Sequence, residues 1–288
     1  MHLQSRLRST SLLPWLDIFA YSYPGGGKTA FGLSAYYERE GARGGPVFFD
    51  FDMRGVDATA ADLGLSGKIP VFSLKTEEEM IYSCSYPQEI VKTVNADPKF
   101  KDYKVEVFVY DTVSSMEDSI MGEGARPQGD LLPASSGFGL MKKQRTRDGI
   151  FEPALGDYKA LHNRTLAFLR RVREMEMHTI VTCHAGRFET HDSPRGLSVP
   201  PELKKFGTFP GINGQNKYTV AKLHDFFLFM EAKGGKFLTY TQSQSDFQAR
   251  TRLRSKLKPV LENLTFWDLL KVYDEARAAE SITTNQGE

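Results

Sequence analysis

Cysteine is scarce in this sequence, and long apolar runs are lacking. The 288 residues include two cysteines, Cys84 and Cys183, which lie far apart in apolar surroundings. Two isolated thiols argue against a disulfide scaffold and predict buried free cysteines in a reducing, cytoplasmic compartment. No apolar stretch reaches about 18 residues, so we expect no membrane span. The apolar segment near the N-terminus contains Asp17, which argues against a signal peptide.

An excess of either charge is also lacking. Lysine and arginine number 37 against 36 aspartates and glutamates, which leaves a formal net charge of +1. Without a global positive field, any binding of nucleic acid has to depend on local basic patches. Hydrophobic residues make up 40% of the chain, which is ample for a core. The length suits one large α/β domain or two small ones.

A glycine-rich turn stands between a predicted strand and a predicted helix. Residues 16–21 are apolar enough for a buried strand, and residues 30–40 favour a helix. The turn between them reads Ser22-Tyr23-Pro24-Gly25-Gly26-Gly27-Lys28-Thr29. Strand, glycine-rich turn and helix form the context of a phosphate-binding P-loop. Glycine lets N–H groups turn toward a phosphate, and the helix start adds its positive end.

The turn also assigns roles to single residues. Lys28 can reach the terminal phosphates, and the Thr29 hydroxyl can hold Mg²⁺. Ser22 stands where the pattern has glycine, so it can make the turn only with a negative φ. Pro24 has no N–H, so we expect the later residues to build most of the cradle. The predicted nucleotide-binding residues are Ser22, Pro24, Gly25, Gly26, Gly27, Lys28, Thr29 and Ala30.

Carboxylates end two further apolar strands. The strand at 104–110 ends on Asp111, which can hold the Mg²⁺ shell through water or serve as a helix N-cap. The strand at 46–52 ends with Asp50 and Asp52, which alternation puts on the same face. Either carboxylate could orient and deprotonate an attacking water. The alternative is a strand end with solvated acids.

Two other polar features end or follow apolar strands. His184 ends the strand at 178–183, where it could contact a γ-phosphate or be a core histidine satisfied by backbone. Its spacing from other histidines matches no standard zinc pattern. Arg250, Arg252 and Arg254 alternate as on one face of a strand. They could act on a neighbour's nucleotide, contact a phosphate backbone, or form a solvated charged edge.

Two long segments lack periodicity, at 122–153 and 186–215. Loops of this length in a compact domain are functional or disordered. Both follow strands with candidate site residues, so we expect them on the same side of the sheet. The remaining predicted elements are a turn at 41–45, a strand at 70–74, helices at 77–94 (with a break expected within 83–87), 157–177 and 265–279, and a hairpin at 225–231 and 236–241.

In their order along the chain, these motifs resemble phage RecA-like ATPases, including the Sak-type proteins that accompany single-strand annealing proteins. The resemblance spans about residues 14–272. It implies a RecA-like α/β fold: a mostly parallel sheet, helices on both faces and a C-terminal β-hairpin. It makes Asp52 the general base, because RecA-like proteins have a glutamate at this spacing from Lys28. It makes His184 the sensor of the γ-phosphate, and it makes Arg250 or Arg252 a residue that acts across a subunit boundary.

The resemblance also implies ligands and partners. ATP and Mg²⁺ are the expected cofactors, with Thr29 and Asp111 at the metal. Single-stranded DNA is expected at 122–153 and 186–215, on a ring or filament of identical chains in the (host) cytoplasm. An annealing protein or a single-strand-binding protein is a further expected partner. The implied organisation is an N-terminal arm at 1–13, an ATPase domain at 14–272 and a helix end with a loose tail at 273–288.

Two other classes of function stay open. A small-molecule P-loop kinase would need a lid with clustered arginines and an acceptor pocket. A structural or packaging-associated NTP-binding protein would fit poor hydrolysis, because Ser22 and Asp52 depart from the usual pattern. Turnover of ATP without an added acceptor separates an ATPase from both alternatives.

Overall fold

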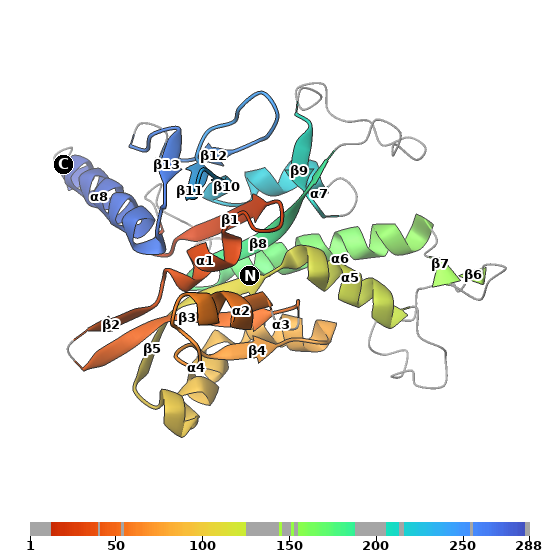
Figure 1. The fold of residues 1–288 in the computed structure, drawn as a ribbon, viewed down its shortest axis with the longest axis horizontal. Helices are drawn as coiled ribbons and strands as arrows, with labels where there is room; N and C mark the ends of the chain where they lie inside the picture. The colour runs from red at the N-terminus through yellow and green to blue at the C-terminus, as the bar shows by residue number, and fades with distance from the viewer. Residues whose placement is uncertain are drawn as a thin grey trace.

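The computed structural model describes residues 13–39, 41–52, 55–124, 144–145, 151–152, 155–187, 206–212, 216–253 and 256–285. They form a mostly parallel sheet that is covered by helices (Figure 1). The parallel strands, in spatial order, are β10 (Phe226–Lys233), β1 (Asp17–Ser22), β8 (His178–Arg187), β5 (Tyr103–Asp111), β3 (Ala42–Asp50) and β4 (Val71–Ser73). Their carboxyl ends meet at one edge, as predicted.

Antiparallel strands extend this sheet. Beyond β10 lie β11 (Lys236–Tyr240) and β13 (Val260–Glu262), and the β10–β11 pair is the predicted hairpin. The other antiparallel pairings are β2 (Tyr37–Arg39) with β3, β12 (Arg250–Thr251) with β10, and β9 (Thr208–Pro210) with β8. A separate pair joins β6 (Gln144–Arg145) and β7 (Phe151–Glu152).

Helices cover both faces because the central strands are apolar on both sides. In β1, Ile18 and Ala20 pack into one buried cluster, and Phe19 and Tyr21 pack into the other. The first cluster includes residues of α1 (Lys28–Leu33), α2 (Gly55–Asp62) and α8 (Phe266–Asn285). The second includes residues of α3 (Glu77–Ser85), α4 (Pro87–Ala96), α5 (Val113–Gly124) and α6 (Leu155–Glu174). The shorter elements are η2 (Pro98–Phe100), α7 (Asn216–Thr219) and η6 (Val220–Lys222).

The helix after the glycine-rich turn is shorter than predicted. It ends at Leu33, so the expectation of a helix over 30–40 was wrong for its second half. The N–H groups of Ala35 and Tyr36 donate to carbonyls three residues earlier, which tightens the last turn. The chain then pairs with β3 as β2, because tyrosine favours a strand where a partner is present. The predicted turn at 41–45 narrows accordingly, since β3 already begins at Ala42.

The other predicted strands and helices are present, with shifted ends. The break expected in the helix at 77–94 lies between α3 and α4, where Pro87 takes the first helical position. The closing helix α8 continues past 279 to Asn285. Most of 122–153 and 186–215, and nearly all of the arm at 1–13, lie outside the described residues, and the domain boundaries stay a prediction.

Two predicted absences can be compared with the structure. Cys84 and Cys183 are both free and buried. None of the helices in the described part of the chain is long and apolar enough to cross a membrane.

Gly45 of β3 lies in close contact with the chain that follows α1. Its φ is 122°, and a Cβ there would overlap the carbonyl oxygen of Ala35. We expect Gly45→Ala to lower the free energy of unfolding by about 3 kcal/mol, because it combines backbone strain with a steric clash. Gly41→Ala is the matched control, since Gly41 has a φ of 83° but open space around it. Gly41→Ala should lower the free energy of unfolding by about 1 kcal/mol. Urea denaturation measures both values, and equal losses would exclude the clash as a cause.

Candidate functional site

The turn between β1 and α1 requires glycine at three positions. Gly25 and Gly27 have φ values of 76° and 92°, in the left-handed region. Gly26 has no room for a side chain, because a Cβ there would lie 2.5 Å from Cβ and Oγ of Ser22. Among the described residues other than glycine, a positive φ occurs only at Asn263. The negative φ predicted for Ser22 is therefore confirmed.

Lys28 begins α1, and its ammonium group is buried. Its Nζ donates to the carbonyl oxygen of Ser22 at 3.3 Å and to Ser22 Oγ at 3.0 Å. It also lies 3.5 Å from Nδ1 of His184. Burial lowers the pKa of Lys28, and the nearby Asp111 carboxylate opposes that shift. The ammonium is thus desolvated among partners that have no negative charge, which suits a lysine that receives an anion.

The first backbone N–H groups of α1 complete an anion site. Lys28, Thr29 and Ala30 begin the helix, where no preceding helical carbonyl can accept from them. Their N–H groups and the positive helix end favour a phosphate. Pro24 contributes no N–H, and the N–H of Gly26 donates to the carbonyl of Tyr23 at 3.0 Å. The residues of the turn that are suited to a phosphate are therefore its last ones.

Asp111 ends β5 and is almost completely buried. Thr29 Oγ1 donates to Asp111 Oδ2 at 2.7 Å, and the Thr182 hydroxyl donates to Oδ1. Burial raises the pKa of Asp111, whereas the two hydroxyl donors and Lys28 lower it. The side chains of Asp111 and Thr29 are thus placed together, as predicted. The prediction had not included Thr182.

This pair fits a magnesium ion of the P-loop type. Mg²⁺ keeps several waters and takes few protein oxygens besides those of the substrate phosphates. The described residues contain no cluster of three or more histidine, cysteine, aspartate or glutamate side chains suited to a metal. A metal here would therefore depend on Thr29 together with phosphate and water, with Asp111 beside it.

Asp52 and His184 face each other at the edge of the sheet. Asp52 Oδ2 lies 3.7 Å from Nε2 of His184, and both side chains are about one-third exposed. Contact with His184 lowers the pKa of Asp52 and outweighs the raising effect of burial. His184 thus lies between Lys28 on one ring nitrogen and Asp52 on the other. The structure brings together three of the predicted catalytic residues.

Asp50 is placed differently from Asp52. Strand β3 ends at Asp50, and Asp52 lies two residues beyond its end, so the expected alternation of the two carboxylates onto one face stays a prediction. Asp50 Oδ1 accepts the backbone N–H of Asp52 at 2.9 Å. Burial raises the pKa of Asp50 to about 6. Asp50 therefore orients the backbone that carries Asp52, while Asp52 is the more exposed carboxylate.

The backbone of His184 is held from two sides. Its N–H donates to Ser114 Oγ on α5 at 3.0 Å, and its carbonyl accepts from the N–H of Gly211 at 2.6 Å. Sequence reasoning missed both Ser114 and Thr182 as site residues. Alternation would have indicated Thr182, because it is a polar residue two positions before His184 in an apolar strand. Ser114 is one of several hydroxyl residues after Asp111, and nothing in the sequence distinguishes it.

The structure does not bring Arg250 and Arg252 to this site. Strand β12 pairs with the first residues of β10, whereas the P-loop is level with Met230 near the other end of that strand. Arg252 forms an ion pair with Asp225, with 3.0 Å between Nη1 and Oδ1. The alternation predicted for Arg250 and Arg252 on one strand was wrong, because β12 ends at Thr251, and Arg254 lies outside the described residues. A role of either arginine in a neighbouring copy stays a prediction.

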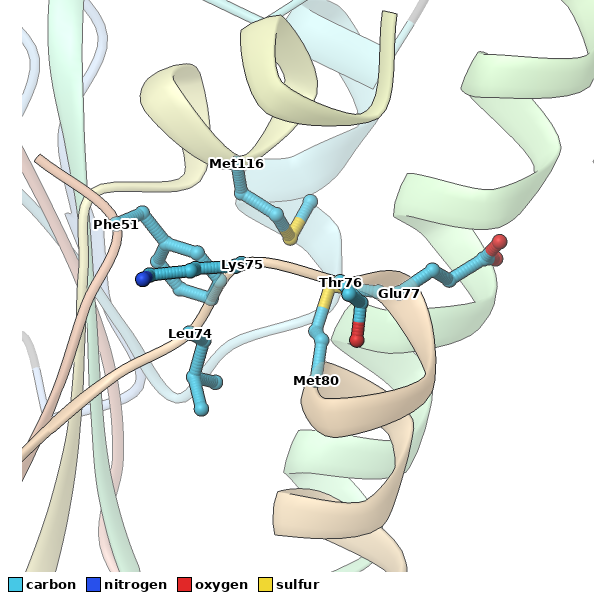
Figure 2. Close-up of a pocket in the computed structure, with 7 residues that line it drawn as sticks. All are labelled: Phe51, Leu74, Lys75, Thr76, Glu77, Met80 and Met116. Carbon is cyan, nitrogen blue, oxygen red and sulfur yellow. The ribbon is translucent and has the colours of Figure 1, made fainter. Parts of the chain in front are cut away.

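A small pocket lies beside Phe51, the residue that follows β3. Figure 2 shows Met116 and Phe51 at this pocket, with the start of α3 on the other side. Its lining is Phe51, Leu74, Lys75, Thr76, Glu77, Met80 and Met116. None of the predicted phosphate- or metal-binding residues is among them. The pocket is therefore separate from the P-loop site.

The fold and the site together define a P-loop nucleotide-binding protein of the α/β class. The sequence family described as an AAA domain matches residues 16–253. Because this match covers more than half of the chain, the protein belongs to the AAA domain family. The predicted P-loop α/β fold, with a mostly parallel sheet, helices on both faces and a hairpin after the parallel strands, is confirmed.

Solved structures similar to this chain include a protein from an archaeon. The chain resembles the KaiC-like protein PH0186 from the hyperthermophilic archaeon Pyrococcus horikoshii OT3, with 15% sequence identity. The similarity covers 83% of this chain and 85% of that chain, with a TM-score of 0.38. No curated protein matches the sequence.

Replacement of Lys28 tests the phosphate site. We expect Lys28→Met to weaken ATP binding by about 100-fold or more, because the charge-assisted contact with phosphate is lost. The melting temperature without nucleotide should stay within about 3 °C, since methionine fills similar space. Calorimetry and thermal unfolding measure the two effects. Lys92→Met, at a side chain with 71% exposure on α4, is the control. Unchanged ATP affinity in Lys28→Met would remove Lys28 from the site.

Proposed function

We propose that this protein is a Mg²⁺-dependent ATPase that acts on single-stranded DNA in phage recombination or replication. The observation that carries the ATPase part is the hydrogen bond between Thr29 and Asp111, beside the buried ammonium of Lys28. A hydroxyl, a carboxylate and a desolvated lysine at one P-loop are the groups that magnesium and a triphosphate need. Membership of the AAA domain family supports the same function.

Each residue then has a distinct role in hydrolysis. Lys28 and the N–H groups at the start of α1 hold the phosphates, and Thr29 with Asp111 holds Mg²⁺, which would neutralise phosphate charge when bound. Asp52 orients the attacking water and accepts its proton. Its lowered pKa keeps it ionised at neutral pH. His184, in reach of both Lys28 and Asp52, responds to the γ-phosphate.

The proposal that the protein binds DNA depends on the segments that follow α5 and β8. Helix α5 begins two residues after Asp111 and leads into 122–153, and β8 continues past His184 into 186–215. Both segments that we propose to bind single-stranded DNA therefore follow directly from site residues. Lys142, Lys143, Arg145 and Arg147 supply local positive charge in the first of them.

The resemblance to Sak-type proteins extends the proposal to assembly. We propose a ring or filament of identical chains in the cytoplasm of the host cell, in which Arg250 or Arg252 reaches the nucleotide of a neighbour. An annealing protein or a single-strand-binding protein would be the functional partner. The position of these arginines away from their own P-loop is compatible with action in trans.

The role of Asp52 predicts a specific kinetic change. We expect Asp52→Asn to lower kcat for ATP hydrolysis by about 100-fold, because the general base is lost. KM should change by less than about threefold, since Asp52 does not hold the phosphates. Asp50→Asn is the matched control, because asparagine keeps an oxygen that accepts the Asp52 N–H. Steady-state phosphate release measures both variants. Normal kcat in Asp52→Asn with a large loss in Asp50→Asn would transfer the role to Asp50.

Stimulation by DNA tests the proposal as a whole. We expect hydrolysis of Mg²⁺-ATP to rise several-fold on addition of single-stranded DNA at low salt, where phosphate contacts are strongest. The measurement is phosphate release without any other acceptor, with and without a single-stranded oligonucleotide. Turnover that is indifferent to DNA would keep the P-loop site but contradict the DNA part. An absence of turnover, with ATP still bound, would favour a structural nucleotide-binding protein.

A further inference from the structure

Phe237 of β11 lies against the last glycine of the P-loop. Its ring atoms lie 2.6–3.0 Å from the position that a Cβ on Gly27 would take. The ring therefore lies against the backbone of Gly27, in the space that a side chain would occupy. Phe237 is nevertheless 39% exposed. An aromatic ring cannot satisfy a phosphate oxygen with a hydrogen bond, so its place beside a phosphate site needs another explanation.

The register of the hairpin places this ring on the side of the sheet that α1 covers. Phe237 is directly opposite Ala232 in the β10–β11 pair, and opposite residues share a face. Met230, two residues before Ala232, packs in the same buried cluster as Phe31 of α1. Met230 is also level with Ser22, the last residue of β1. Phe237 therefore lies just beyond the carboxyl end of β1, next to the P-loop.

The backbone of Phe237 is fixed by its neighbours. Its N–H donates to Asn263 Oδ1 at 3.0 Å, and its carbonyl accepts from the N–H of Asn263 at 2.7 Å. Asn263 has a φ of 48°, which asparagine tolerates better than most residues. The adjacent Lys236 pairs with Glu262 at 2.6 Å. The ring is thus presented by a hydrogen-bonded strand, which is the preorganisation expected of a binding residue.

We infer that Phe237 stacks on the base of a nucleotide bound at the P-loop. This inference rests on the proposed binding of ATP there. When N–H groups at the start of α1 hold the phosphates, the nucleoside has to extend beyond the turn, and Phe237 offers exposed aromatic surface beside Gly27. Aromatic rings stack on every base, because each base has a π-face. The contact therefore favours nucleotides over bare phosphate chains without a strong choice among bases.

The test compares a ligand that has a base with one that lacks it. Calorimetry in Mg²⁺ gives the affinities of ADP and of inorganic pyrophosphate. Phe237→Ala should weaken the binding of ADP by about five- to a hundredfold and leave the affinity for pyrophosphate within about twofold of the unaltered protein. Phe237→Leu keeps apolar contact with Gly27 but has no planar face. It should therefore also weaken the binding of ADP and leave the binding of pyrophosphate unchanged. Phe237→Tyr keeps the ring, so its affinity for ADP should stay within about threefold of the unaltered protein.

The control variant is Tyr82→Ala, which removes a similarly exposed aromatic side chain (47%) from α3. It should leave both affinities unchanged. Equal weakening of ADP and pyrophosphate in Phe237→Ala would show that the ring only shapes the P-loop, and unchanged ADP binding would show that it does not touch the nucleotide. Either result overturns the inference while the P-loop site stands. If the unaltered protein bound neither ligand, the proposed function would fail together with the inference.

Discussion

The buried carboxylate of Asp111 is the constraint on which the site depends. A charge that is 3% exposed is tolerated only where donors replace the lost water. Those donors are hydroxyls of Thr182 on β8 and Thr29 on α1. Because Thr29 and Asp111 are 82 residues apart, their hydrogen bond joins the start of α1 to the end of β5, and Thr182 joins both to β8. Displacement of any of the three elements would deprive the buried carboxylate of Asp111 of a hydrogen-bond donor.

A second set of contacts surrounds the ammonium group of Lys28. The atoms that contact Lys28 Nζ are a carbonyl oxygen, a hydroxyl oxygen and an imidazole nitrogen, and none of them has a full negative charge. Burial accordingly lowers the pKa of Lys28, and a phosphate would supply the missing counter-charge. Since Lys28 also contacts His184, movement of the ammonium toward a phosphate would change what His184 contacts. Through Ser114 and Gly211, that change would reach α5 and the residues after β9.

The sequence predicted the features that depend on local pattern and missed those that depend on long-range pairing. Asp111 and His184 could be placed beside the P-loop because parallel strands bring their carboxyl ends to one edge. The helix expected over 30–40 failed because pairing with β3 outweighs helix propensity there. The alternation predicted for Arg250 and Arg252 failed because β12 pairs with β10 at residues 250 and 251 alone. Phe237 could not be found, because only the folded hairpin brings it to Gly27.

The serine at position 22 is a compensated change and not a weakened P-loop. Ser22 Oγ accepts from Lys28 at 3.0 Å and donates to the carbonyl of Tyr23 at 2.8 Å, so the hydroxyl is part of the turn. Its Cβ and Oγ occupy the space that a side chain at Gly26 would need. A serine at 22 thus requires a glycine at 26, and the pair together preserves the turn. The departure that bears on the proposed hydrolysis is therefore Asp52, where a shorter carboxylate replaces the expected glutamate and lies 3.7 Å from His184.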